Sequence, residues 1–332
     1  MTPGKQLRIA IEECELPHPL FLAQHKPLQE RIEDALDGAA SRIERVIGPS
    51  RVGKSMLINA LCRLYPETKV DGRRHVPVLQ VPLPPGISHS GLSVSVLTAL
   101  GLPVPHSGKS AKPRELEERM KHQLQLAGTR VLMFEEASHL VDVGARVPPR
   151  VAADWFKTLA DRLNLTLLLF GVPRLERLFE CNEQLRTRAS ASRRLLPYDS
   201  RIPANMQAFH SCVATYANLF RESGYPIELP GQALTYQCYL LSGGLIGVLS
   251  RFMQELASQQ SSVQPCSLTF TDCQAAVSAI EVAGSPNFPA FADPSAIEAG
   301  VAPAALHQAF VTVMNDNDLP VPLLEKLSRA AQ

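Results

Sequence analysis

Residues 48–55 read Gly48-Pro-Ser-Arg-Val-Gly-Lys-Ser55, and the predicted architecture of the chain follows from them. The stretch matches the pattern G-x-x-x-x-G-K-[ST] and comes directly after a short apolar-alternating run, Ile43 to Ile47. The next run, Met56 to Leu64, has a helical pattern, so the expected order is strand, loop and helix. A glycine-containing turn before a helix is the plainer interpretation. The two glycines, the Lys-Ser ending and this order of elements favour a phosphate-binding loop (Walker A).

Each residue type in this loop suits phosphate binding. Gly48 and Gly53 lack a Cβ, so the backbone can form a nest of N–H donors around phosphate oxygens. Lys54 places a positive charge between the β- and γ-phosphates, and the Ser55 hydroxyl can coordinate Mg²⁺. The dipole of the following helix adds to this anion site. The predicted cofactors are therefore ATP and Mg²⁺, and the predicted binding residues here are Gly48, Pro49, Ser50, Arg51, Val52, Gly53, Lys54, Ser55 and Met56.

A second apolar run, residues 129–136, ends in two carboxylates and predicts the other half of the site (Walker B). A buried parallel strand delivers the side chains at its C-terminal end to the edge of the sheet where ligands bind. The usual order there is Asp, which holds Mg²⁺ through water, and then Glu, which polarises the attacking water. Here Glu135 takes the first position with one extra methylene, and Glu136 is the predicted catalytic base. A strand capped by solvent-facing acids is the alternative.

The segment Glu136-Ala-Ser-His139 also has the E-x-x-H spacing that can place two metal ligands on one helical face. No second pair of this kind accompanies it, and Glu136 already has a role in the nucleotide site. The sequence therefore disfavours a metal site here, and His139 is expected to orient the carboxylates or to contact a neighbour.

Composition restricts the class of protein. With 45% hydrophobic residues, 20% charged residues and a net charge of +1, the chain is a globular protein of about two domains, and any nucleic-acid contact needs a local basic face. The seven cysteines are scattered without a C-x-x-C pair, which argues against a zinc module and for a reducing cytoplasm. Neither a secretory signal nor an apolar run of about 18 residues is found, so no membrane association is expected.

The order of elements predicts an α/β fold with a five-stranded parallel sheet flanked by helices, followed by a small C-terminal α-helical lid. Four regions are expected: an extended N-terminal extension (1–26), a nucleotide-binding domain (27–200), a helical lid (201–282) and an irregular Pro- and Ala-rich tail that could dock a partner (283–332). Helices are expected to begin with residues 27–38, and strands are expected at 43–47, 76–83, 129–136, 165–172 and 195–198.

Several arginines follow the strongest strand, residues 165–172. In ring-forming ATPases, an arginine on the helix before the fifth strand reaches the γ-phosphate bound by the neighbouring subunit. Arg188 fits this role best, and its rivals are Arg186, Arg193 and Arg194. An ordinary basic helix end is the alternative to any one of them. In the lid, Arg251 follows a Gly-rich turn and is expected to close onto the nucleotide phosphates.

The assembled pattern resembles the TniB/TnsC family of AAA+ P-loop transposition regulators, found in Tni-type and CRISPR-associated transposons, over roughly residues 15–280. The resemblance rests on GPSRVGKS (48–55), HVPVLQVPLP (75–84), VLMFEEASHLV (131–141), LLLFGVPRLERL (167–178), QLRTR (184–188) and GGLIGVLSRF (243–252). It implies an ATP-dependent homo-oligomer, a hexameric or heptameric ring or a filament, on double-stranded DNA in the bacterial cytoplasm at the nucleoid. Such an assembly links a TniQ-like target selector to a TnsA/TnsB-like or TniA-like transposase, and ATP hydrolysis removes it. A polar γ-phosphate sensor, usual after strand 165–172 in AAA+ ATPases, is absent, and Arg174 is the nearest polar residue.

If such a ring surrounds DNA, its inner loops would supply cations to phosphates without reading sequence. Candidates are Lys109, Lys112, Arg146 and Arg150, which lie in two loops that contain Pro. For any one of the lysines, a solvated position on the surface is the plainer interpretation.

Three other functions stay open from the sequence. A non-hydrolysing, nucleotide-gated DNA-binding scaffold would account for Glu135 in place of Asp. A replication-initiator or clamp-loader ATPase would share the fold, but usually has a further DNA-reading domain, for which the last 50 residues look too irregular. An unrelated kinase or GTPase is disfavoured, because the chain has no N-K-x-D guanine signature and has a helical C-terminal half.

Overall fold

The computed structural model describes residues 2–14, 16, 18–104, 112–261, 264–280, 289–295 and 300–323. The chain forms two compact units. The sheet unit comprises Phe21–Gly48 and Lys54–Leu195. The helical unit comprises Met1–Leu20, Pro49–Gly53 and Leu196–Gln332, so the five residues of the glycine-rich loop group with it.

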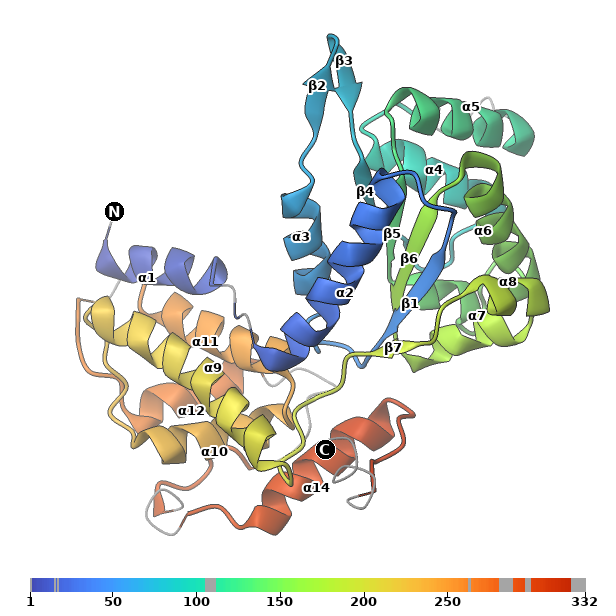
Figure 1. Cartoon of the computed structure of the whole chain (residues 1–332). Coiled ribbons are helices and arrows are strands. Elements are labelled where there is room, and N and C mark those ends of the chain that lie inside the picture. The colour runs from blue at the N-terminus through green and yellow to red at the C-terminus, as the bar shows by residue number, and fades with distance from the viewer. Residues whose placement is uncertain are drawn as a thin grey trace. The chain divides into compact units, whose positions relative to one another are not determined.

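The sheet unit is built on a five-stranded sheet with the strand order β4-β5-β6-β1-β7, in which every neighbouring pair is parallel (Figure 1). The strands are β1 (Ile43–Ile47), β4 (Val78–Pro82), β5 (Val131–Glu135), β6 (Thr166–Gly171) and β7 (Arg193–Arg194). The central strands are buried on both faces, which explains why β5 and β6 are apolar runs without alternation. The predicted five-stranded parallel sheet is confirmed.

Helices cover both faces of this sheet (Figure 1). On one face lie α2 (Pro19–Leu36) and α3 (Lys54–Leu64), whose apolar side chains pack on Val46, Met133 and Phe170. On the other face lie α4 (His89–Ala99), α5 (Pro113–Leu126), α6 (Pro149–Leu163), α7 (Glu176–Glu180) and α8 (Glu183–Arg188), with the short turns η1 (Ala137–Val141) and η2 (Pro173–Leu175). Successive residues of each strand point to opposite faces of the sheet, so the strands contribute side chains to a hydrophobic core on each face.

Two boundaries in the sheet unit differ from the sequence prediction. Helix α2 begins at Pro19 and continues through Pro27, where the sequence predicted its start. Buried Phe21 and Leu28 pack in one cluster on both sides of Pro27, and this packing outweighs the lost backbone hydrogen bond. The fifth strand occupies 193–194 rather than 195–198, because Pro197 has no N–H to continue the ladder.

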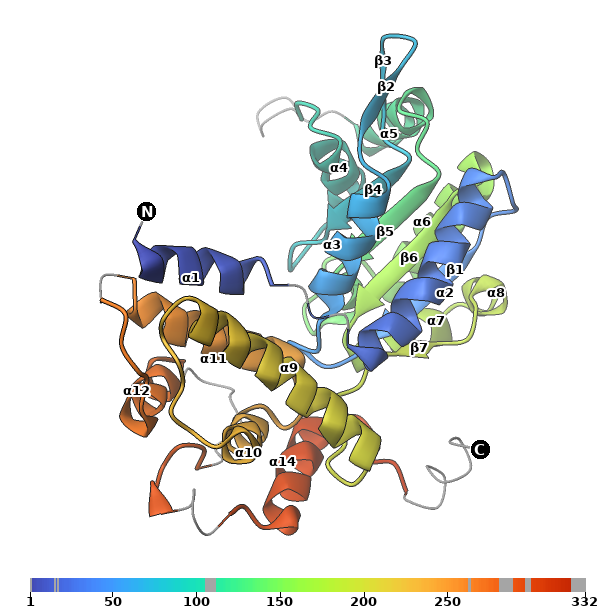
Figure 2. The same ribbon diagram turned by 60° about the vertical axis from the view of Figure 1, so that its left-hand side comes forward.

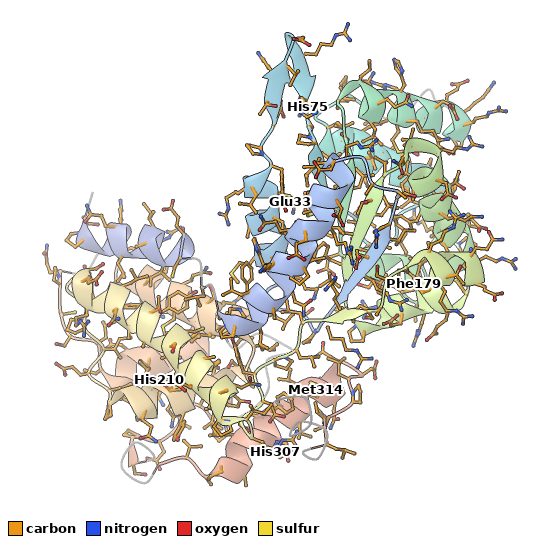
Figure 3. The ribbon with its side chains drawn as sticks, viewed as in Figure 1. Glu33, His75, Phe179, His210, His307 and Met314 are labelled. Carbon is orange, nitrogen blue, oxygen red and sulfur yellow. The ribbon has the colours of Figure 1, made fainter. Side chains whose placement is uncertain are left out.

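An antiparallel hairpin that the sequence analysis missed leads into β4. Its strands, β2 (Thr68–Val70) and β3 (Arg73–His75), form a separate two-stranded sheet that projects beyond the main sheet (Figure 1). The turn residues Asp71 and Gly72 both have positive φ, as a tight hairpin turn requires. His75 lies at the base of the hairpin (Figure 3). Its ring fills the space that a Cβ on Gly128 would need, which anchors the hairpin there.

The helical unit contains α1 (Pro3–Glu12), α9 (Pro203–Glu222), α10 (Gly231–Ser242), α11 (Ile246–Gln259), α12 (Phe270–Ile280) and α14 (Pro303–Asp316) (Figure 2). The N-terminal residues were expected to be extended, but they form a helix. Pro3 begins α1 in the first turn, where a missing N–H costs nothing, and Leu7 and Ile11 are buried as α1 packs on α9 and α11.

The tail is also more ordered than expected. Helix α14 packs on α10, and Phe310, Met314 and Leu319 form a buried cluster with Leu196. A Cβ on Gly243, at the end of α10, would lie 2.5 Å from Val313 Cγ2 of α14. The segment 303–319 is therefore a packed part of the helical unit, not a linker.

All seven cysteines are free thiols. Cys181 and Cys266 are exposed, whereas Cys212, Cys238 and Cys273 are buried.

Among the helices described, none is by itself long and apolar enough to cross a membrane. Only α10 and α11, taken together across a 114° bend, pass that test of length and composition.

Candidate functional site

The glycine-rich loop connects β1 to α3. The Gly48 N–H donates to the Gly171 carbonyl (3.1 Å), which joins the start of the loop to the end of β6. Arg51 (φ 62°) and Gly53 (φ 108°) have left-handed backbones, and this turn directs the chain into α3. Lys54, Ser55 and Met56 then form the first turn of an 11-residue helix, whose free N–H groups and dipole favour an anion.

Lys54 is only 6% exposed, and its Nζ donates to the Gly48 carbonyl (3.0 Å). Burial lowers the pKa of Lys54 to about 8, while the charges of Glu136 and Glu135 oppose this shift. The ammonium group is thus held at the loop, in a place where water stabilises it poorly. An anionic phosphate would replace the lost solvation with direct charge contact.

The lowered pKa of Lys54 predicts how anion binding depends on pH. The free protein loses the Lys54 proton as pH rises through about 8, and phosphate binds the protonated form. Phosphate itself titrates near pH 6, so its charge is constant above pH 7.5. We expect the Kd for ATP to rise above pH 8, approaching about tenfold per pH unit. Titration with a fluorescent nucleotide from pH 7.5 to 9.5 measures this.

A Lys54→Arg variant is the control for that titration, because a guanidinium stays charged throughout the range. Its Kd should be flat with pH. An equally steep rise in Kd for Lys54→Arg would show that another group is responsible.

Glu135 ends β5 and joins two other polar side chains. The Ser55 hydroxyl donates to Oε1 of Glu135, and Gln80 Nε2 of β4 donates to Oε2 (3.0 Å). A hydroxyl and a carboxylate in contact are oxygen ligands of the kind that Mg²⁺ prefers, so the donor set fits that ion. Gln80, the one strongly polar side chain in its strand, was missed in the sequence.

Glu136 follows in a conformation that its residue type disfavours. Its φ of 54° and ψ of 37° are left-handed, which costs a non-glycine residue about 1–2 kcal/mol. Strain of this kind is found at functional sites, where the surrounding structure holds it. It turns the chain from β5 into η1, a 3₁₀ turn, so Glu136 and His139 do not share an α-helical face. His139 Nδ1 instead lies 2.8 Å from the Leu83 carbonyl oxygen, and no metal-binding cluster of His, Cys, Asp or Glu occurs within the described ranges.

Comparison with known families identifies the family of the chain. The family model of the bacterial TniB protein matches residues 23–196, more than half of the chain. The chain belongs to the TniB family. No curated protein matches it by sequence.

Solved structures similar to this TniB-family chain share its fold at low identity. ORC2 of Aeropyrum pernix, solved as ADPNP-ADP complexes, has a TM-score of 0.59 and 14% identity, covering 96% of this chain and 87% of that one. The structure of Aeropyrum pernix ORC1 in complex with DNA has a TM-score of 0.58 and 14% identity, and the match covers 97% of this chain and 85% of that one. The structure of CDC6P from Pyrobaculum aerophilum has a TM-score of 0.57 and 12% identity, and the match covers 95% of this chain and 84% of that one. The TniB-family chain therefore has an AAA+ P-loop fold.

Within the helical unit of this TniB-family chain, α11 packs directly on the glycine-rich loop. The Gly247 N–H donates to the Arg51 carbonyl (2.8 Å), and a Cβ on Gly247 would lie 2.4 Å from that oxygen. Arg251 is exposed one turn later, on the same side of the helix by its i+4 spacing. A similar close approach places Gly244 on the Tyr198 backbone. The glycines of residues 243–247 thus hold the start of α11.

Gly247→Ala is expected to weaken nucleotide binding, because the new methyl collides with a backbone oxygen of the loop. Overpacking of this kind costs about 1–3 kcal/mol, which corresponds to about a 5–150-fold rise in the Kd for ATP if the loop is displaced. Isothermal titration measures it. Gly231→Ala is the matched control, since its nearest neighbour would be 3.7 Å away. An unchanged Kd for Gly247→Ala would mean that contact between α11 and the loop does not affect binding.

The four candidate arginines of this TniB-family chain differ in their ion pairs. Arg188, the last residue of α8, pairs with Asp161 of α6. Arg193 pairs with the buried Glu44 of its own subunit (3.3 Å), which leaves it unsuited to reach a neighbour. Arg186 and Arg194 are exposed and make no ion pair with any described residue.

The candidate basic residues occupy two places in the sheet unit. Lys112 is the residue just before α5, Arg146 lies before α6, and Arg150 lies in the first turn of α6. All three are exposed, whereas Lys109 lies outside the described residues. After β6, Arg174 pairs with Asp142 and lies at the surface. A polar side chain that contacts that strand end is the buried Ser138, whose Oγ accepts from the Val172 N–H (3.5 Å).

Proposed function

We propose that this TniB-family chain binds and hydrolyses ATP with Mg²⁺ and, in its ATP-bound state, assembles on double-stranded DNA as a regulator of transposition. The observation that carries the proposal is the group at the ends of β1 and β5. There the buried Lys54 amine, the Ser55 hydroxyl and the Glu135 and Glu136 carboxylates come together. This is the donor set that phosphoryl transfer to water requires.

Each side chain in this group has a distinct role. Lys54 contacts the β- and γ-phosphates and stabilises the charge that develops there. Ser55 and Glu135 would hold Mg²⁺, which neutralises phosphate charge when bound. Gln80 keeps the Glu135 carboxylate in place. Glu136 accepts a hydrogen bond from the attacking water and takes up its proton. As the water oxygen bonds to the γ-phosphorus, the bond between that phosphorus and the ADP oxygen breaks, and ADP leaves with the electron pair.

Assembly would complete the site. We propose that Arg251 contacts the phosphates from the same subunit and that Arg188 reaches the γ-phosphate bound by a neighbour. ATP then favours a homo-oligomeric ring or filament, and hydrolysis weakens it. Lys109, Lys112, Arg146 and Arg150 would contact DNA phosphates. The family membership supports a TniQ-like selector and a transposase as partners, and the ORC1 neighbour was solved with DNA.

The test is electron microscopy of the protein with double-stranded DNA, with a slowly hydrolysed ATP analogue or with ADP, alongside steady-state ATPase measurements. Assemblies on DNA with the analogue alone, together with DNA-stimulated turnover, are expected. ATP binding and assembly without turnover would instead support the non-hydrolysing scaffold, and monomers in both nucleotides would exclude the assembly mechanism.

Glu135→Gln is expected to raise the Mg²⁺ concentration for half-maximal ATPase activity by about tenfold or more, because an amide oxygen carries no charge for the ion. Chelation of Mg²⁺ should abolish turnover in both proteins. Glu135→Asp is the matched variant, since it restores the commoner residue and should stay within a few-fold of wild type. An unchanged Mg²⁺ requirement for Glu135→Gln would remove Glu135 from the metal site.

A further inference from the structure

Glu44 is a fully buried carboxylate, 0% exposed, on the strand that leads into the glycine-rich loop. A charge in such a place must be paired, because no water reaches it. Three side chains surround it. The Ser190 hydroxyl donates to Oε1 (2.7 Å), Arg193 Nε donates to Oε2 (3.3 Å), and Arg31 Nε of α2 lies 3.3 Å from Oε1. Two of these partners come from one short segment after α8.

That segment runs along β1 with one extra residue. Ala189 bridges Ile43 and Arg193 pairs with Val46, so four steps on the segment match three steps on the strand. An extra residue of this kind is a bulge, which interrupts the backbone ladder locally. The Glu44 side chain spans the bulge and bonds Ser190 on one side and Arg193 on the other. It replaces the missing ladder contacts with side-chain contacts.

The same bulge directly follows Arg188, the last residue of α8. The ion pair between Arg188 and Asp161 joins side chains that are 45% and 37% exposed, and exposed pairs of this kind are weak and exchangeable. The guanidinium can therefore leave Asp161, while the backbone below it is held by the contacts of Glu44. We propose that Glu44 is a positioning residue that fixes the end of α8, so that Arg188 is presented to the nucleotide of a neighbouring subunit.

This inference rests on the proposed function, and it predicts which of the two neighbouring subunits Glu44 affects. Glu44 acts on the arginine that its own subunit donates, not on the nucleotide that its own subunit binds. A buried carboxylate that only stabilises the fold would affect both equally. Mixing two inactive variants separates the two roles.

The experiment mixes a donor and an acceptor. Glu136→Gln binds ATP and retains Arg188 but lacks the catalytic base, and Arg188→Ala has a working site but no arginine. Each alone should be nearly inactive, and the mixture should regain ATPase activity about tenfold or more above either one, because the donor supplies Arg188 to the acceptor. Glu44→Gln is then added to one partner at a time. On the donor it should remove the regained activity, and on the acceptor it should change it less than about twofold.

Two further variants keep the test decisive if Glu44→Gln folds poorly. Ser190→Ala removes one contact at the bulge and should also act only on the donor. Glu176→Gln is the matched control, because Glu176 pairs with Arg45 of the same strand (3.3 Å) and makes no contact with the bulge. The Arg45 guanidinium lies over the ring of Phe179, the residue that Figure 3 labels on α7. Glu176→Gln should change neither mixture.

The outcomes are separable. Equal loss on donor and acceptor overturns the positioning role and leaves the arginine in trans intact. A mixture that stays inactive without any Glu44 substitution overturns the trans arrangement itself, and the positioning role with it.

Discussion

Glu136→Gln is expected to lower the turnover number for ATP by about 10²–10⁴-fold while leaving the Kd for ATP within a few-fold of wild type. Glutamine keeps the size of the side chain but cannot take up the proton of the attacking water. Lys54, Ser55 and Glu135 remain to hold the nucleotide. Assemblies formed with ATP should therefore persist as they do with a slowly hydrolysed analogue. Single-turnover kinetics and electron microscopy after prolonged incubation measure the two effects.

Glu136→Gly tests whether the strained backbone serves the site. Glycine adopts a left-handed backbone freely, so this variant should be as inactive as Glu136→Gln but about 1 kcal/mol more stable than it. Retained turnover in either variant would transfer the role of base to another residue. Lower stability of Glu136→Gly would mean that side-chain contacts outweigh the strain.

Lys54→Met is expected to abolish nucleotide binding and at the same time to stabilise the free protein. The pKa of Lys54 falls from 10.5 to about 8 on folding, and at about 1.4 kcal/mol per pH unit this costs about 3 kcal/mol at neutral pH. The sign follows from proton binding: between pH 8 and 10.5 the unfolded chain holds the extra proton, so wild-type stability rises with pH through that window. Methionine removes the buried charge and the bond to Gly48, for a net gain of about 1–3 kcal/mol. Thermal unfolding from pH 7 to 10 measures it.

Lys121→Met is the control for that stability measurement. Lys121 is also little exposed (7%), but it pairs with Glu117 (2.6 Å) and Glu118 (3.0 Å). Burial lowers its pKa, but the hydrogen bonds and charges of these two carboxylates together outweigh burial and raise it. Its replacement should destabilise the protein and leave nucleotide binding unchanged. If both variants were destabilised alike, the buried ammonium of Lys54 would not be a cost to the fold.

The central sheet and the lid helices could be predicted because their signals are local. The apolar runs that became β5 and β6 show the lack of alternation of strands buried on both faces. Helix α10 lies within the predicted helical lid, and the glycine that follows it forms a left-handed C-cap, which is a local sequence signal. Ser55, at the end of the loop motif, contacts Glu135, the last residue of β5, so residues of the two predicted motifs lie side by side.

The hairpin β2–β3 and helix α14 were not predicted, although the sequence contains a local signal for each. The pair Asp71-Gly72 is a hairpin signal between polar strands, but hydrophobic alternation, the usual mark of a strand, is missing there. In α14, Leu306, Phe310 and Val313 have helical spacing after an initial Pro303, although the Pro-rich residues before it suggested a linker.

Some features of the site have no local signal. The left-handed backbone of Glu136 depends on the sharp turn from β5 into η1. The contacts of Glu44 with Ser190 and Arg193 join residues about 150 positions apart in the chain, so only the folded sheet brings them together. Gly247 is required by one backbone oxygen, that of Arg51, and a glycine in a helical pattern does not say what it touches.

The thiols of this chain differ in reactivity in a way that supplies ready labelling sites. Burial raises the pKa of Cys62 to about 11 and those of Cys212 and Cys273 to about 12, so at neutral pH they lack the nucleophilic thiolate. Cys181 and Cys266 are the exposed pair, and they belong to the sheet unit and the helical unit respectively. Maleimide dyes should therefore attach there first. Energy transfer between them would report, in the unmutated protein, whether ATP and ADP set different distances between the two units.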